Sequence, residues 1–138
     1  MLARIAILLA AVAIAIAGVA VVFTASQPAD YLQKDLVVDD AIYYLKTAQN
    51  FVAGHGYSLD GRHLTNGVQP LWAIVVCGLA FLTDDTTAVI RAMVLLSGGL
   101  WIAGGWLLFV LLRRLHATSG LLAMLVWLMA GFEVRWAL

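Results

Sequence analysis

The run from Ile5 to Ala25 carries no charged side chain, and this run limits what the chain can fold into more than any other feature. At a rise of about 1.5 Å per residue, a helix over this run crosses the roughly 30 Å hydrocarbon core of a bilayer. The flank from Met1 to Arg4 is short and positive, as in a signal sequence, but the apolar core of a cleaved signal is usually about 7–15 residues long. We therefore expect a retained signal anchor with its amino terminus in the cytoplasm.

The composition of the whole chain points to the same class of protein. Of 138 residues, 64% are hydrophobic and 12% are charged, whereas soluble domains are about 45–50% apolar and about 25% charged. Eight basic residues balance eight acidic ones, which excludes the basic surface of a nucleic-acid-binding protein. The single cysteine, Cys77, excludes an intramolecular disulfide and a cysteine metal site. The sequence predicts an all-α integral membrane protein.

Four apolar runs define a single membrane module, 1–138. We predict about four transmembrane helices, with the outer loop over 26–69 after the first of them; the predicted spans are 5–25, 68–82, 88–112 and 120–135. A helix over 68–82 would reach only about 22 Å. Either this helix extends into its polar flanks, or it begins below the membrane surface under a loop that dips into the lipid.

The charged residues predict conflicting orientations for four alternating spans. With Arg4 in the cytoplasm, Asp84 and Asp85 fall inside and Arg113 and Arg114 fall outside, against the tendency of basic loops to stay in the cytoplasm. Because the first span usually dominates, we expect the acidic loop to face outward. The orientation of the last two helices stays open.

The polar segment contains a short amphipathic helix, preceded by two acidic residues. Ile42, Leu45 and Val52 recur at helical spacing before Gly54, which predicts a helix at the membrane surface. One carboxylate of the pair 39–40 can cap this helix, and the helix dipole favours both charges. A second carboxylate beside the cap leaves room for a general base or a ligand of a divalent metal.

Other residues near this helix allow a structural and a functional interpretation. Tyr43 and Tyr44 are typical of an aromatic belt at the headgroup level, or could stack against a sugar. His55 and His63 lack a metal-ligand spacing and are interpreted as loop structure. Arg62 is either an exposed loop residue or a fork of donors for a phosphate.

Small residues in the third span repeat at a spacing of two helical turns. Ser97, Gly98 and Gly99 are followed by Gly104 and Gly105, a pattern typical of a close-packing seam against another helix.

The segments DDAIYYL (39–45), AGHGY (53–57), DG (60–61) and TNGVQPLW (65–72) resemble the first outer loop of bacterial GT-C membrane glycosyltransferases. Such enzymes transfer a sugar from a polyprenyl-phosphate donor. The resemblance implies that Asp39 or Asp40 activates the acceptor hydroxyl without a cofactor, a divalent metal at the pair being left open. It also implies substrate contacts from a set of loop and helix residues: Tyr43, Tyr44, His55, Arg62, Asn66 and Gln69.

The resemblance also implies partners, since GT-C enzymes generally have eight or more spans. Besides the lipid-linked donor and membrane lipids, we expect further carboxyl-terminal helices or a second membrane polypeptide. The alternative is a non-catalytic accessory subunit that docks to a larger membrane complex through the Gly98/Gly105 seam. A transporter fragment is disfavoured, because no ionisable residue lies at the middle of a span.

Overall fold

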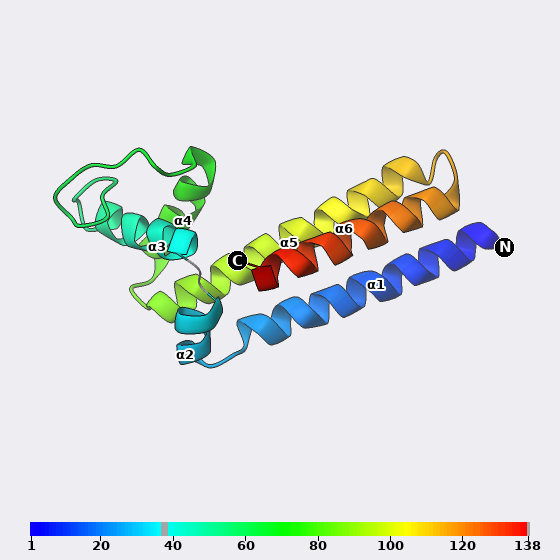
Figure 1. Ribbon diagram of the computed structural model, residues 1–138, viewed down its shortest axis with the longest axis horizontal. Coiled ribbons are helices and arrows are strands. Elements are labelled where there is room, and N and C mark those ends of the chain that lie inside the picture. Colours follow the sequence, from blue (N-terminus) through cyan, green and yellow to red (C-terminus); the bar gives the residue numbers. More distant parts are fainter. Residues whose placement is uncertain (37–38, 138) are drawn as a thin grey trace. The chain divides into compact units, whose positions relative to one another are not determined.

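The computed structural model describes residues 1–36 and 39–137, with the side chains of Asp35, Asp39 and residues 132–137 outside the description. Every regular element in these ranges is helical, as the sequence predicts (Figure 1). The elements are α1 (Leu2–Ala25), α2 (Ala29–Tyr31), the π-helical turn η1 (Leu32–Leu36), α3 (Asp39–Val52), α4 (Pro70–Leu82), α5 (Thr86–Leu112) and α6 (Ala117–Ala137).

Two of these helices, α1 and α5, are long and apolar enough to cross a membrane. The apolar helices Pro70–Leu82 and Ala117–Gly131 are shorter. Because α4 begins at Pro70 and ends at Leu82, it does not extend into its polar flanks, which removes the first of the two alternatives for the run 68–82. Its length is about 20 Å, well short of a hydrocarbon core of about 30 Å.

The chain divides into two compact units. Unit 1 combines Met1–Thr24 with Leu95–Leu138, and unit 2 is Ala25–Val94. Unit 1 therefore contains most of α1, the later part of α5, and α6. Unit 2 contains α2, η1, α3, α4 and the beginning of α5.

In unit 1, α1 runs antiparallel to the later part of α5, and α6 returns beside both (Figure 1). Near one end, Gly98 of α5 faces Val21 of α1. Near the other end, Ala6 and Ala10 of α1 share a buried core with Phe109 of α5. Small residues on α1 allow this close approach, as is usual between helices in lipid.

The predicted seam of small residues is a packing surface within the chain. A Cβ on Gly98 would lie 2.5 Å from Cγ1 of Val21, and a Cβ on Gly105 would lie 3.1 Å from Cδ1 of Trp127 on α6. Gly104 also faces Trp127, whereas Gly99 has nothing within 4 Å of its Cβ position. Gly98, Gly104 and Gly105 of the seam are therefore covered by the chain's own helices, as expected for a close-packing seam against another helix.

Helices α5 and α6 are also joined by two hydrogen bonds between tryptophans. Nε1 of Trp127 donates to the carbonyl oxygen of Trp101 at 2.8 Å, and Nε1 of Trp101 donates to the carbonyl oxygen of Trp127 at 3.3 Å. In lipid an indole N–H has no water to bind, so this reciprocal pair satisfies both donors.

Unit 2 is built on the buried face of α3. Leu45 and Ala48 point into a core with residues of α4 and of early α5, namely Val76, Cys77, Ala80, Val89, Ile90 and Met93, together with Leu32 of η1. The other two positions of the predicted apolar stripe, Ile42 and Val52, are exposed. Polar contacts add to this core, since Nε2 of Gln49 donates to Oγ1 of Thr86 at 3.0 Å.

We expect Gly98→Ala to destabilise unit 1 by about 1–3 kcal/mol, because the added methyl group overlaps Val21 and forces the helices apart. The matched control is Gly99→Ala, whose methyl group meets nothing within 4 Å. This control should be neutral or stabilising by up to about 1 kcal/mol, because alanine is the better helix former. Unfolding in mixed detergent micelles measures both variants. Equal stabilities of the two variants would contradict the packing described here.

Candidate functional site

The acidic pair lies at the start of α3. This helix begins at Asp39, so both carboxylate residues belong to its first turn, where the helix dipole favours negative charge. Asp40 is exposed, and the side chain of Asp39 lies outside the described residues. The carboxylate of Asp40 is thus accessible from solvent.

Two neighbouring tyrosines of α3 hold the end of the following loop, 53–69. The hydroxyl groups of Tyr43 and Thr65 are hydrogen-bonded at 2.7 Å. The backbone N–H of Gln69 donates to Oη of Tyr44 at 2.8 Å, which links α3 to the residue that precedes α4. Among the predicted substrate-binding residues, the structure thus brings Tyr44 and Gln69 into contact, and it gives both tyrosines a role in ordering the loop.

A second group of hydrogen bonds fixes the middle of the loop, and the sequence analysis did not identify it. Nδ2 of Asn50 donates to the carbonyl oxygens of Ser58 at 2.8 Å and Leu59 at 3.0 Å. The N–H of Thr65 donates to the carbonyl oxygen of Tyr57 at 2.7 Å. The signal that could have revealed it is an amide side chain in the last turn of a helix, directly before a glycine-rich turn.

Three glycines give this loop its shape. Gly54, which follows the end of α3, has a φ of +84°, Gly56 has a φ of +70°, and Gly61 has a φ of +74°. All three values lie in the left-handed region that side chains with a Cβ disfavour. The turn signals read from the sequence therefore mark real changes of chain direction.

Asp60 organises the tip of the loop. Its Oδ1 accepts hydrogen bonds from the backbone N–H groups of Arg62 at 2.9 Å and His63 at 2.8 Å. Its Oδ2 lies 2.7 Å from Nδ1 of His63. The bonds from His63 hold the pKa of the Asp60 carboxyl well below its usual range, and the side-chain bond to Asp60 raises the pKa of the His63 imidazole.

The remaining predicted residues lie on the loop surface. His55, Arg62 and Asn66 are exposed, and so is Gln69. His63 has a carboxylate partner in Asp60 that the sequence analysis missed, because it considered only metal-ligand spacings. Among the side chains that the structure describes, which do not include Asp39, no group of three or more histidine, cysteine or acidic residues could hold a metal ion.

Unit 2 also contains a pocket of about 400 Å³, beside the end of α3 and the turn between α4 and α5. Its polar lining consists of Gln49, Thr83 and Asp84. The apolar lining residues are Val52, Ala53, Ala80 and Val89. None of the predicted site residues lines this pocket.

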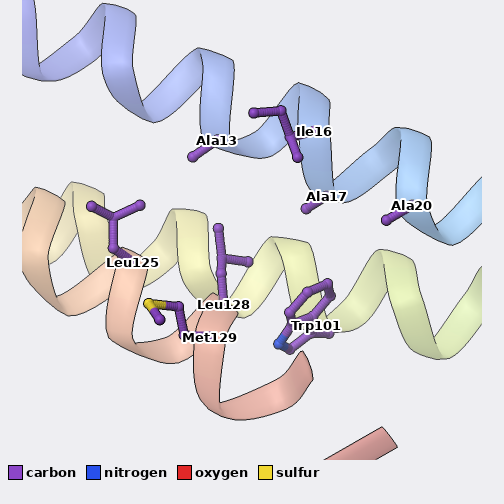
Figure 2. Close-up of a pocket in the computed structure, with 8 residues that line it drawn as sticks. All are labelled: Ala13, Ile16, Ala17, Ala20, Trp101, Leu125, Leu128 and Met129. Atoms are coloured by element: carbon purple, nitrogen blue, oxygen red, sulfur yellow. The ribbon is translucent and has the colours of Figure 1, made fainter. Parts of the chain in front are cut away.

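Unit 1 has an apolar pocket of about 360 Å³ between its three helices. Figure 2 shows alanines and Ile16 of α1 on one side, and Trp101 of α5 with side chains of α6 on the other. The lining residues are Ala13, Ile16, Ala17, Ala20, Trp101, Leu125, Leu128 and Met129. Such a lining suits a hydrocarbon chain and offers little to a polar ligand.

We expect Tyr43→Phe and Thr65→Val each to destabilise unit 2 by about 0.5–1.5 kcal/mol, through loss of one hydrogen bond. The double variant should cost less than the sum of the two, because both changes remove the same bond. As a control, Tyr43→Phe combined with Thr118→Val on α6 should be additive. Additive effects in the first pair would show that the bond does not hold the loop.

The stability of the loop tip should decrease at low pH, through Asp60, and again at higher pH, through His63. The contribution of Asp60 is full above the ordinary carboxyl pKa of 3.8 and is lost as the pH falls through its lowered value. The contribution of His63 is full below the ordinary imidazole pKa of 6.5 and is lost as the pH rises through its raised value. Asp60→Asn keeps an oxygen acceptor for the turn but removes the charge. An NMR titration of this variant should return the pKa of His63 toward 6.5, and an unchanged pKa would contradict the pairing.

Comparisons of the chain with protein family models, with curated proteins and with solved structures found no match. The site is therefore defined by its residues and their geometry. In unit 2 its parts are two carboxylate residues in the first turn of α3, a loop that α3 itself holds in place, and the pocket beside Asp84.

Proposed function

We propose that the chain is the amino-terminal module of a GT-C-type glycosyltransferase in the bacterial inner membrane, with its amino terminus in the cytoplasm. The observation that carries the proposal is the pair Asp39–Asp40 in the first turn of α3. The loop beside this helix is fastened to it through Tyr43 and Tyr44. The resemblance of residues 39–72 to the first outer loop of these enzymes supports the same reading.

Transfer of a sugar to an acceptor hydroxyl needs one general base. A sugar hydroxyl is a poor nucleophile until its proton is removed, and an ionised carboxylate can accept that proton as the new glycosidic bond forms. The polyprenyl phosphate leaves with the electrons of its bond to the anomeric carbon, so a single displacement inverts that carbon. The positive end of the α3 dipole favours the ionised carboxylate that this step requires.

The donor's lipid chain needs an apolar site. The pocket between α1, α5 and α6 has a volume of about 360 Å³, within the range of roughly 300–1,000 Å³ that is usual for ligand sites. We assign this pocket to part of the isoprenoid chain of the donor. Further helices, on this polypeptide or another, would complete the enzyme.

A second candidate function is that of a non-catalytic subunit in a larger membrane complex. One observation favours it, because Asp40 is exposed and lines neither of the two pockets described above. Since the Gly98/Gly105 seam is occupied by the chain's own helices, such a subunit would dock through another surface. Native mass spectrometry of the detergent-purified chain separates the two readings, because a stable stoichiometric partner of unrelated activity supports the subunit.

We expect Asp39→Asn and Asp40→Asn together to reduce sugar transfer by about 10²–10⁴-fold, the usual contribution of a general base. Membrane insertion should be unchanged, since asparagine is well tolerated at the start of a helix. The control is Asp30→Asn, which removes an exposed carboxylate that pairs with Lys34 at 3.8 Å. Transfer is measured in the complete assembly that contains the chain, and full activity of the double variant would end the assignment.

A further inference from the structure

We propose that the chain crosses the membrane three times, through α1, α5 and α6, and that α4 stays on the outer face with α3 and the loop 53–69. The surface formed by Arg4, Arg113 and Arg114, at the end of unit 1 where α1 begins and α5 ends, then lies among the anionic headgroups of the cytoplasmic leaflet. This proposal does not depend on the catalytic role of Asp39 and Asp40.

The first argument comes from unit 1, whose geometry places three arginines at one end. The start of α1 shares its core with Phe109, near the end of α5. The guanidinium of Arg113 lies over the ring of Phe109, 5.6 Å from its centre. Arg4 and the turn after α5 therefore lie at the same end of the unit (Figure 1), and Arg4, Arg113 and Arg114 are all exposed there.

Because the start of α1 and the end of α5 lie together, the number of membrane crossings between the two helices can be inferred. If α1 leads from the cytoplasmic to the outer face, α5 must begin on the outer face, because it ends beside the start of α1. The segment between them then begins and ends on the outer face, so it crosses the membrane an even number of times. Within the described residues of that segment, α4 is the only apolar helix of ten or more residues. A single helix gives an even count only when it does not cross.

The second argument comes from unit 2 and is independent of the first. Tyr44, early in α3, binds the N–H of Gln69 just before α4. The last turn of α3, at Val52, lines the same pocket as Thr83, just after α4. The part of α3 from Tyr44 to Val52 therefore packs against α4 and lies close to the residues that flank both ends of α4. If α4 crossed the membrane, it would carry α3 with it, including the exposed Lys46, and a charged side chain is costly in the hydrocarbon core.

The proposed topology removes the conflict between the charges. The basic end of unit 1 is then cytoplasmic, where basic loops are found and where the leaflet carries anionic lipids. The turn at Asp84 and Asp85 moves to the outer face, together with Asp39 and Asp40. The pocket beside Asp84 consequently opens on the same side of the membrane as the acidic pair.

Labelling of single cysteines distinguishes three crossings from four. In a Cys77→Ala background, one cysteine is introduced at an exposed position of each turn by Arg62→Cys, Asp84→Cys or His116→Cys. A membrane-impermeant maleimide should label positions 62 and 84 in intact cells, and position 116 only after permeabilisation. Labelling of 62 and 116 but not 84 in intact cells would establish four alternating spans and overturn the proposal.

Two controls keep this result interpretable. Labelling after detergent permeabilisation shows that each thiol is reactive. Where a thiol stays unreactive, a protease site inserted in the same turn shows on which side of the membrane that turn lies. Either method decides the face on which the turn between α4 and α5 lies.

A second experiment tests the role of the basic end. Arg4→Gln, Arg113→Gln and Arg114→Gln together should produce a mixed population in which position 116 is labelled from both sides. The matched control removes three exposed positive charges from the outer face, by Lys34→Gln, Lys46→Gln and Arg62→Gln, and should leave the labelling of position 116 unchanged. Identical labelling of the two triple variants would show that the basic end does not hold the orientation.

Discussion

The close approach of α1 and α5 at Gly98 and Val21 is the contact on which the rest of the structure depends. In lipid, apolar side chains gain little from touching each other, so helices associate where small residues let their backbones come near. This contact aligns α1 and α5 in opposite directions and leaves α6 to close the bundle through Gly105 and the two tryptophans. Which charged turns share an end of the bundle follows from that alignment.

Hydrophobic periodicity was enough to predict the helical class and the helix over α3, because both depend on local patterns. Of the apolar positions in that pattern, Leu45 is buried, whereas Ile42 and Val52 are exposed. Which helix ends lie together could not be predicted, because apolar length carries no information about contacts between distant segments. The run 68–82 looked like a short span, and its contacts with α3 become visible only when Tyr44, Gln69 and Thr83 are seen in space.

In the loop 53–69, too, some features could be predicted from the sequence and others could not. Its glycine turns were readable from the sequence, since left-handed backbone favours glycine. The bonds of Asn50 to two carbonyl groups, and the pairing of Asp60 with His63, were missed because the sequence analysis sought ligands rather than turn-forming side chains. Tyr43 and Tyr44 were expected to meet substrate or lipid, and the structure ties their hydroxyl groups to the loop. The ordered loop is thus a property of the chain itself, on which any binding role must build.

The paired indoles of Trp101 and Trp127 have a mechanical consequence for the bundle. Each ring reaches across to the backbone of the opposite helix, so sliding α6 along α5 by a single residue ruptures both bonds at the same moment. The two rings therefore fix the register of the α5–α6 hairpin, so that the two helices can tilt together more easily than one can slide along the other.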